Sequence, residues 1–341
     1  MNRSNNKRIN IGIQILRMIS CFGVITTHCY NLNWNKRLQY YLYVNPLHVP
    51  NFMFISFYFY YNPLLTRIIR KIIQRFERLL IPYLIWSFLF GLINNICLYL
   101  FGFCKYGRYI SIKDYLYQII IGERYFFVFW YSTVLLFLSL IFTIIGFSFK
   151  EHFLFTIQLF GFILYALHRS SIYIFLVKNN LMNISFILTF RFAPISVFGL
   201  TLGSFDIIAN MKQFYIKNII INVISLYYLV KFRIFNFNEE YIYPDVDTNI
   251  ISSINFFIIF ALIPFDKILN EKIIVIIAHI TNYTGGIYYL HLFMRFYLKN
   301  IFEEVRRKTF IGIFIIYFIT YLVCYIGNKV FKKSKIKYLF I

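Results

Sequence analysis

Long uninterrupted apolar runs are the feature of this 341-residue chain that most restricts how it can fold. Most runs reach about 18 residues or more, enough for a helix to cross the roughly 30 Å hydrocarbon core of a bilayer. Polar residues fall mainly between the runs, and the composition is 60% hydrophobic against 14% charged. A soluble domain usually has about a quarter charged residues. The pattern therefore predicts an all-α, multi-pass integral membrane protein.

The apolar runs predict a bundle of about ten transmembrane helices. A polar connector after the third run has an amphipathic middle at 110–121. The chain shows no internal repeat and no linker, so a single integral-membrane domain spanning residues 1–341 is expected. The predicted helices are Ile11–Tyr30, Leu47–Tyr61, Leu79–Phe101, Tyr125–Phe147, Phe153–Leu167, Ile184–Leu202, Phe214–Phe232, Ile250–Phe265, Ile273–Leu298 and Phe310–Val330.

The chain carries a formal net charge of +22. In a soluble protein this points to nucleic acid, but cytoplasmic loops of membrane proteins also carry excess Lys and Arg. We therefore expect a lipid bilayer, and no nucleic acid, as the partner of the basic surface. The dense basic segments Arg67–Arg78 and Lys329–Lys337 fall on the N-terminal side of a ten-helix bundle, so both termini are predicted to be cytoplasmic. The acidic segment Asn236–Thr248 falls on the opposite side, and either the plasma membrane or an endomembrane fits.

The first predicted helix holds two ionisable side chains, Arg17 and His28, inside an apolar run. Such residues are costly in a membrane and usually face a bundle interior or a wet cavity. The eleven-residue spacing comes within about 20° of three full turns, so both lie on one face, roughly 16 Å apart along the axis. The alternative without a functional role is that Arg17 snorkels to the interface and His28 is a polar residue near the helix end.

Arg17, ten further residues and then His28 resemble the first-helix signature of the acyltransferase-3 family of membrane-bound acyltransferases. Further matches follow in the order of the family as far as residue 291. Phe57 departs from the family pattern, which has glycine there, and the start of the fourth helix lacks the usual tryptophan. The matching stretches are 49–56, the Arg75-x-x-Arg78 segment leading into Pro82, Tyr83 and Trp86, 124–128, 198–203 and 286–291.

The resemblance implies transfer of an acyl group, typically acetyl, from acyl-CoA to a hydroxyl of a sugar, glycan or related acceptor. A hydroxyl is a poor nucleophile, so a general base is needed, and His28 is the candidate. Arg17 is assigned to donor contact or to the thioester oxyanion. Arg75 and Arg78, at the expected cytoplasmic entrance to the third helix, are the candidates for binding the phosphates of coenzyme A. No metal is expected, because the chain has no HExxH motif and no clustered histidines.

A transporter or flippase that uses Arg17 and His28 as an intramembrane polar path is the alternative. Transporters often have inverted repeats and helices interrupted by Gly or Pro in matching halves, and the sequence shows neither pattern. A third interpretation is a scaffold protein that has lost the activity of the family, which the departure at Phe57 keeps open. His291 also lies in a family-like stretch, and a structural hydrogen bond is given at least the same weight there as a substrate contact.

Overall fold

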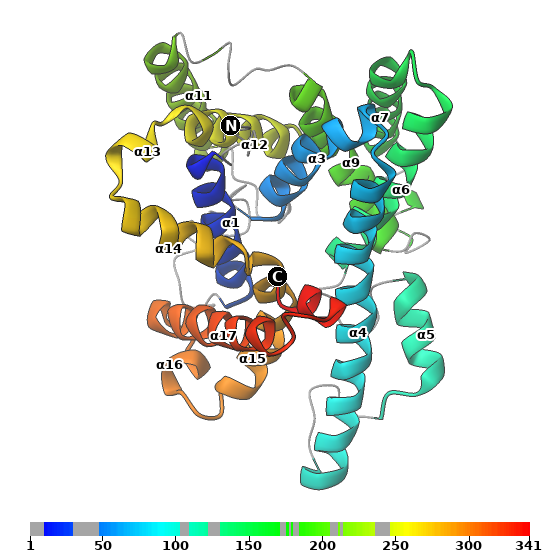
Figure 1. The fold of residues 1–341 in the computed structure, drawn as a ribbon, viewed down its shortest axis with the longest axis vertical. Coiled ribbons are helices and arrows are strands. Elements are labelled where there is room, and N and C mark those ends of the chain that lie inside the picture. Colours follow the sequence, from blue (N-terminus) through cyan, green and yellow to red (C-terminus); the bar gives the residue numbers. More distant parts are fainter. Residues whose placement is uncertain are drawn as a thin grey trace, which may run out of the picture.

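The computed structural model describes residues 10–29, 48–102, 109–121, 130–170, 175–176, 179, 184–204, 211, 214–235 and 246–341. Every regular element in these ranges is helical, and Figure 1 shows the helices packed against one another. The all-α prediction is therefore confirmed for the described part of the chain.

The helices follow the predicted apolar runs, and the amphipathic connector forms a helix of its own, α5. The longer helices are α1 (Ile11–Cys29), α3 (Val49–Leu65), α4 (Ile69–Phe101), α5 (Ile112–Ile121), α6 (Trp130–Ser148), α7 (Phe153–Arg169), α9 (Ile184–Ser204), α11 (Tyr215–Phe235), α12 (Val246–Leu262), α14 (Glu271–Thr281), α15 (Thr284–Leu298) and α17 (Phe310–Val330). The short ones are α13 (Phe265–Ile268), α16 (Glu303–Arg306) and the 3-10 helix η2 (Lys335–Leu339).

Five of the described helices, α1, α4, α6, α9 and α17, are long and apolar enough to cross a membrane. The number rises to six if α14 and α15, which are bent by 62° at a break, count as one span. Shorter apolar helices cover Phe153–Arg169, Tyr215–Leu229 and Asp247–Leu262. The prediction of about ten spans is not confirmed, because several predicted runs form helices shorter than the roughly 20 residues of a usual crossing.

α4 begins at Ile69, and not at Leu79 as the sequence analysis predicted. Its 33 residues rise by about 50 Å, so it is longer than a ~30 Å hydrocarbon core. The early start has a local cause, because residues 70–78 contain no Gly or Pro and are rich in Arg, Lys, Gln and Glu, which favour helix. Arg75 and Arg78 therefore lie within a helix, and not in a loop before it.

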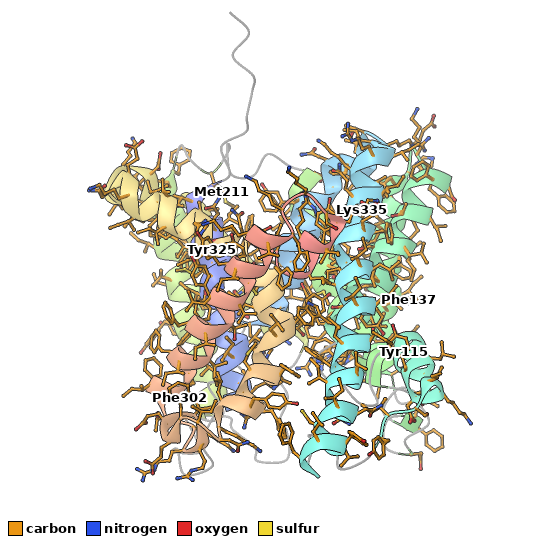
Figure 2. All side chains as sticks on the ribbon, turned by 60° about the horizontal axis from the view of Figure 1, so that its bottom comes forward. Tyr115, Phe137, Met211, Phe302, Tyr325 and Lys335 are labelled. Atoms are coloured by element: carbon orange, nitrogen blue, oxygen red, sulfur yellow. The ribbon has the colours of Figure 1, made fainter. Side chains whose placement is uncertain are left out.

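Most of the long helices run between two ends of the bundle, called here the Lys335 end and the Phe302 end after residues labelled in Figure 2. At the Lys335 end, Arg67 in the α3–α4 turn donates to two backbone carbonyls at the C-terminal end of α6. At the Phe302 end, Arg169 of α7 pairs with Asp247 of α12. These cross-links fix which helix ends lie together.

The described start of the chain, the α3–α4 turn and η2 all lie at the Lys335 end (Figure 2). Asn10 donates to the carbonyl of Ala261 at 2.7 Å, which ties the start of α1 to the end of α12. The structure thus gathers at one end the three segments predicted to be cytoplasmic. That this end faces the cytoplasm stays a prediction.

Two glycines bring α9 against α3. A Cβ at Gly199 would overlap the carbonyl of Phe54, and one at Gly203 would overlap the carbonyl of Tyr58. Small residues at such positions allow two helix backbones to approach closely, as is common in membrane bundles. The pair holds α3 in the interior, where it presents Ser56 to the site described next.

Candidate functional site

α1 and α15 lie side by side and run in the same direction. Arg17 donates from Nη2 to Oγ1 of Thr284 at 3.2 Å, and Arg295 donates to the backbone carbonyl of His28. In both pairs the partner lies 267 residues further along the chain, so the two helices keep one register over three turns. The Sγ atom of Cys21 adds a contact with the carbonyl of Thr284 at 3.7 Å. The polar face predicted for α1 is therefore the face that meets α15.

The imidazole rings of His28 and His291 lie together at this seam, with centroids 5.3 Å apart and planes inclined by 35°. His291 is fully buried, and its Nδ1 lies 2.6 Å from the carbonyl oxygen of Tyr288. Because a carbonyl oxygen only accepts hydrogen bonds, Nδ1 is the donor. In a neutral His291 this leaves Nε2 as the basic nitrogen. Two histidines from distant parts of the chain thus form one unit.

Tyr131 of α6 lies near both of the half-buried arginines, Arg17 and Arg75. The centroid of its ring lies 4.8 Å from that of Tyr288. The Tyr288 centroid is in turn 5.9 Å from that of His291. A row of neighbouring side chains therefore leads from Arg75 to the histidine pair.

Arg75 points into the bundle. Its Nε donates to Oγ of Ser139 at 3.0 Å, and its two Nη atoms donate to the carbonyl and the Oγ of Ser56 at 3.2 and 3.0 Å. The guanidinium carbon lies 5.0 Å from the centroid of the Phe57 ring and 4.1 Å from that of Tyr60. Phe57, which stands where the family has glycine, therefore supplies one of two aromatic faces that hold Arg75.

Arg78 lies elsewhere, exposed at the Lys335 end of the bundle. Its guanidinium carbon is 5.9 Å from the centroid of the Tyr338 ring. Beside it, Nζ of Lys335 donates to Oε1 of Glu77 at 2.5 Å. This hydrogen bond, together with the charge of the carboxylate, raises the pKa of Lys335. Arg75 and Arg78 are neighbours on one helix but meet different surroundings.

The structure thus links three of the four predicted site residues and separates the fourth. Arg17 and His28 share the α1–α15 seam, and Arg75 lies near Tyr131, whose ring packs on Tyr288 of this seam, while Arg78 lies in the surface group around Tyr338. The chemical roles given to these residues stay predictions.

Sequence reasoning ranked His291 below His28 and did not single out Tyr131 or Arg295. The family-like stretch that ends at His291 did carry a signal. Tyr288, His291 and Arg295 recur at spacings of three and four residues, which places them on one helical face. Tyr131 had no comparable signal, because its helix is apolar on most sides.

Within the described ranges, no group of three or more His, Cys, Asp or Glu side chains is placed to hold a metal ion. The family-like stretch 124–128, which would begin the fourth predicted helix, lies outside the described residues. The described site therefore consists of buried and half-buried bases, cations and hydroxyl groups. These can bind anionic or polar groups and move protons.

Comparison with known proteins gives one finding. A family model described as an acyltransferase domain, of the type called acyltransferase 3, matches residues 10–329, nearly the whole chain. No curated protein and no solved structure matches the chain significantly.

Proposed function

Since the chain belongs to the acyltransferase-3 family, we propose that it is a membrane-bound acyltransferase that uses acyl-CoA to acylate a hydroxyl of a sugar, glycan or related acceptor. The transferred group is proposed to be acetyl, and His28 the general base. The observation that carries this proposal is the His28–His291 pair on the seam that also holds Arg17. Direct transfer without a covalent enzyme intermediate is the simplest route for such a site.

In the proposed step, His28 takes the proton of the acceptor hydroxyl while the hydroxyl oxygen attacks the carbonyl carbon of the thioester. A C–O bond forms first, and the C–S bond then breaks. The coenzyme A thiolate leaves and takes the proton from the protonated imidazole. The products are the acyl ester and free coenzyme A, and His28 returns to its neutral form.

The distance between Arg17 and His28 along α1 favours a role for Arg17 in contacting the donor over a role in stabilising the oxyanion. Arg17 and His28 are eleven residues apart, which is about 16 Å along a helix. An arginine side chain does not span that distance, so Arg17 does not meet a carbonyl that reacts beside His28. An extended donor that passes along the seam would contact Arg17 first and place its thioester at His28. Of the two candidates for binding the phosphates, Arg78 is proposed to interact with them at the Lys335 end, whereas Arg75, which Ser56 and Ser139 already hold inside the bundle, is proposed to have a structural role.

A transporter remains the second candidate because of one observation, the break between α14 and α15. Interrupted helices are typical of transporters, whose half-helix N-termini face anionic substrates. α15 begins at Thr284, which binds Arg17. A transporter of sugars has no need for acyl-CoA, however, so binding of the donor separates the two candidates.

The test is acetyl transfer by the full-length protein in nanodiscs, followed as release of the coenzyme A thiol from acetyl-CoA in the presence of an acceptor hydroxyl. His28→Ala is expected to lower turnover by about 100-fold or more, the usual contribution of a general base. His152→Ala is the matched control, since His152 is exposed at the start of α7 and makes no side-chain capping bond. The control is expected to turn over like the wild type.

Binding of coenzyme A is measured on the same samples. Equal turnover in His28→Ala and wild type would remove His28 as the base. Wild-type protein that binds no donor would instead favour the transporter. Loss of turnover with donor binding intact would support the chemical role of His28.

A further inference from the structure

The chain folds back on itself after α17, and residues 335–340, called here the C-terminal strap, pack between α4 and α17 and touch the start of α15 (Figure 1). Nε1 of Trp86 donates to the carbonyl of Leu339 at 3.0 Å. The rings of Trp86 and Phe340 meet edge to face with centroids 5.9 Å apart. Leu339 and Phe340 are buried, so the strap is part of the fold and is anchored from inside.

Two glycines make room for this anchor. A Cβ at Gly286 would lie 2.7 Å from the carbonyl oxygen of Phe340, and one at Gly327 would lie 2.4 Å from the nearest atom of the Phe340 ring. Separations under 3 Å do not occur for real Cβ atoms, so the strap fits only because these residues of α15 and α17 lack side chains. The strap therefore rests against the first turn of α15, immediately next to Thr284, which binds Arg17.

The outer side of the strap differs from its anchor. Tyr338 carries two cations on its ring, with the Arg78 guanidinium carbon 5.9 Å and Nζ of Lys337 5.5 Å from the centroid. Lys335 stands next to them, bound to Glu77. Lys332 and Lys333 are exposed just before the strap. Glu77 neutralises one of these cations, which leaves the group strongly positive.

A half-exposed aromatic ring flanked by cations matches the chemistry of an adenine nucleotide. A base stacks on an aromatic face, and phosphate oxygens accept charge-assisted hydrogen bonds from Arg and Lys. An excess of Lys and Arg alone is explained by membrane orientation, but that rule does not account for a tyrosine ring with two cations close to it. The strap also lies beyond the residues matched by the family model, which end at 329.

We propose that the C-terminal strap and Arg78 form the binding platform for the adenosine and phosphate end of acyl-CoA, with the base on Tyr338 and the phosphates on Arg78 and Lys337. This rests on the proposed function, because it names where that donor is held. The platform lies at the Lys335 end of the seam, so the remainder of the donor would extend past the start of α15 towards Arg17 and His28.

The experiment measures binding of coenzyme A to the full-length protein in nanodiscs by calorimetry. Tyr338→Ala combined with Lys337→Gln is expected to weaken binding by at least about tenfold, the size of one lost base stack. Tyr338→Phe keeps the aromatic face and is expected to bind like the wild type. The matched control is Phe296→Ala with Lys299→Gln, which removes a similar pair near the Phe302 end, where Nζ of Lys299 lies 4.4 Å from the ring centroid. This control is expected to leave the affinity unchanged.

Competition and proteolysis give independent readouts. Adenosine 3′,5′-bisphosphate is expected to compete with coenzyme A, and pantetheine is not. Coenzyme A is also expected to slow tryptic cleavage at Lys332, Lys333 and Lys335 in the wild type but not in the double variant, which retains these three lysines.

Wild-type binding that the double variant retains would overturn the platform and leave the proposed function intact. A wild type that binds no coenzyme A would overturn both. An equal loss of affinity in the control pair would show a general effect of mutation and would also overturn the platform. A double variant that fails to elute as a single species is replaced by Tyr338→Ala alone, which is judged by the same affinity and cleavage criteria.

Discussion

Two imidazole rings from α1 and α15 meet where the proposed chemistry takes place. The carbonyl of Tyr288 fixes the tautomer of His291, and Arg295 holds the backbone of His28. A base gains from such neighbours because its orientation is set before the substrate arrives. His291 therefore acts on the reaction through His28 and is a positioning residue in this proposal.

His291→Gln is expected to lower kcat while leaving KM for acetyl-CoA nearly unchanged, because the donor is proposed to bind elsewhere. The loss should be smaller than the ~100-fold or greater loss expected for His28→Ala. Turnover measured across pH should shift its profile, since the ring next to the base is replaced by an uncharged amide. His152→Gln serves as the control. An unchanged profile together with an unchanged kcat would contradict the positioning role.

A substitution at Arg75 distinguishes a structural role of this residue from a role in binding the donor. Arg75→Ala removes hydrogen bonds to Ser56 and Ser139 and is expected to lower the free energy of unfolding by about 1–3 kcal/mol, the cost of buried polar groups that lose a partner. Thermal unfolding in detergent measures this loss, with Arg78→Ala as the control at an exposed position. Unchanged stability with lost coenzyme A binding would instead assign Arg75 to the donor.

The sequence predicted the shared face of Arg17 and His28 because helical geometry decides it locally. It did not predict the partners, since Thr284, His291 and Arg295 lie far along the chain and reach α1 only through tertiary packing. The resemblance did pick out the stretch ending at His291. The sequence also did not predict that Arg75 and Arg78 of α4 have different surroundings. Burial at neighbouring positions of one helix depends on which other helices pack there.

Close packing of α3 and α9 sets the position of the wall that binds Arg75. The glycines that allow this packing lie in a stretch that the sequence marked as family-like, although its role was not apparent from composition. Side chains at these positions would force the two backbones apart, and Ser56 would move with α3.

Gly199→Ala is expected to lower the free energy of unfolding by about 1–3 kcal/mol, as overpacking in a tight interior usually does. Gly91→Ala is the matched control, because a Cβ there would meet only a methyl group of Ile110, at a normal van der Waals distance of 3.7 Å. Alanine also favours helix over glycine by about 1 kcal/mol, so this control should be neutral or stabilising. Thermal unfolding of the two variants in one detergent decides the point, and equal melting temperatures would contradict the tight contact.

Element boundaries were predicted well where apolar runs end in polar loops and poorly where they do not. The prediction began the third helix at Leu79 because charge replaces apolar residues before it, yet strong helix formers carry α4 back to Ile69. The prediction kept Ile273–Leu298 as one helix because the run stays apolar. The Asn282 and Gly285–Gly286 signals for a break were present but weak, and hydropathy does not register them.

At the scale of the whole molecule, the distribution of basic residues agrees with the order in which the helices cross the bundle. The α3–α4 turn, the start of α1 and the strap lie at one end, and the described residues there include the basic group at Lys332, Lys333 and Lys335. Placing this end in the cytoplasm satisfies the positive-inside rule and gives the proposed platform access to cytosolic acyl-CoA. Orientation and donor supply are thus consistent with each other.

α7 is one of several shorter helices that separate the five or six spans found among the described residues from the predicted ten. Its 17 residues rise by about 26 Å, slightly less than the ~30 Å hydrocarbon core. Yet its two ends lie at opposite ends of the bundle, since Arg169 pairs with Asp247 near the Phe302 end while the helix begins near the α3–α4 turn. A bilayer can thin locally around a short helix at modest cost. We therefore expect α7 to cross.

Lys150→Cys and Ser170→Cys, made singly, flank this helix and test the crossing. In sealed, oriented membrane vesicles, a charged thiol reagent added outside is expected to label one variant and not the other, with wild-type protein as the background for the native cysteines. Lys332→Cys and Lys299→Cys flank the long helix α17 and calibrate the assay, because that helix passes the span test outright. Labelling of both α7 variants from one side would place α7 along a single interface, and an arrangement of ten spans that includes α7 would then be wrong even with the family assignment intact.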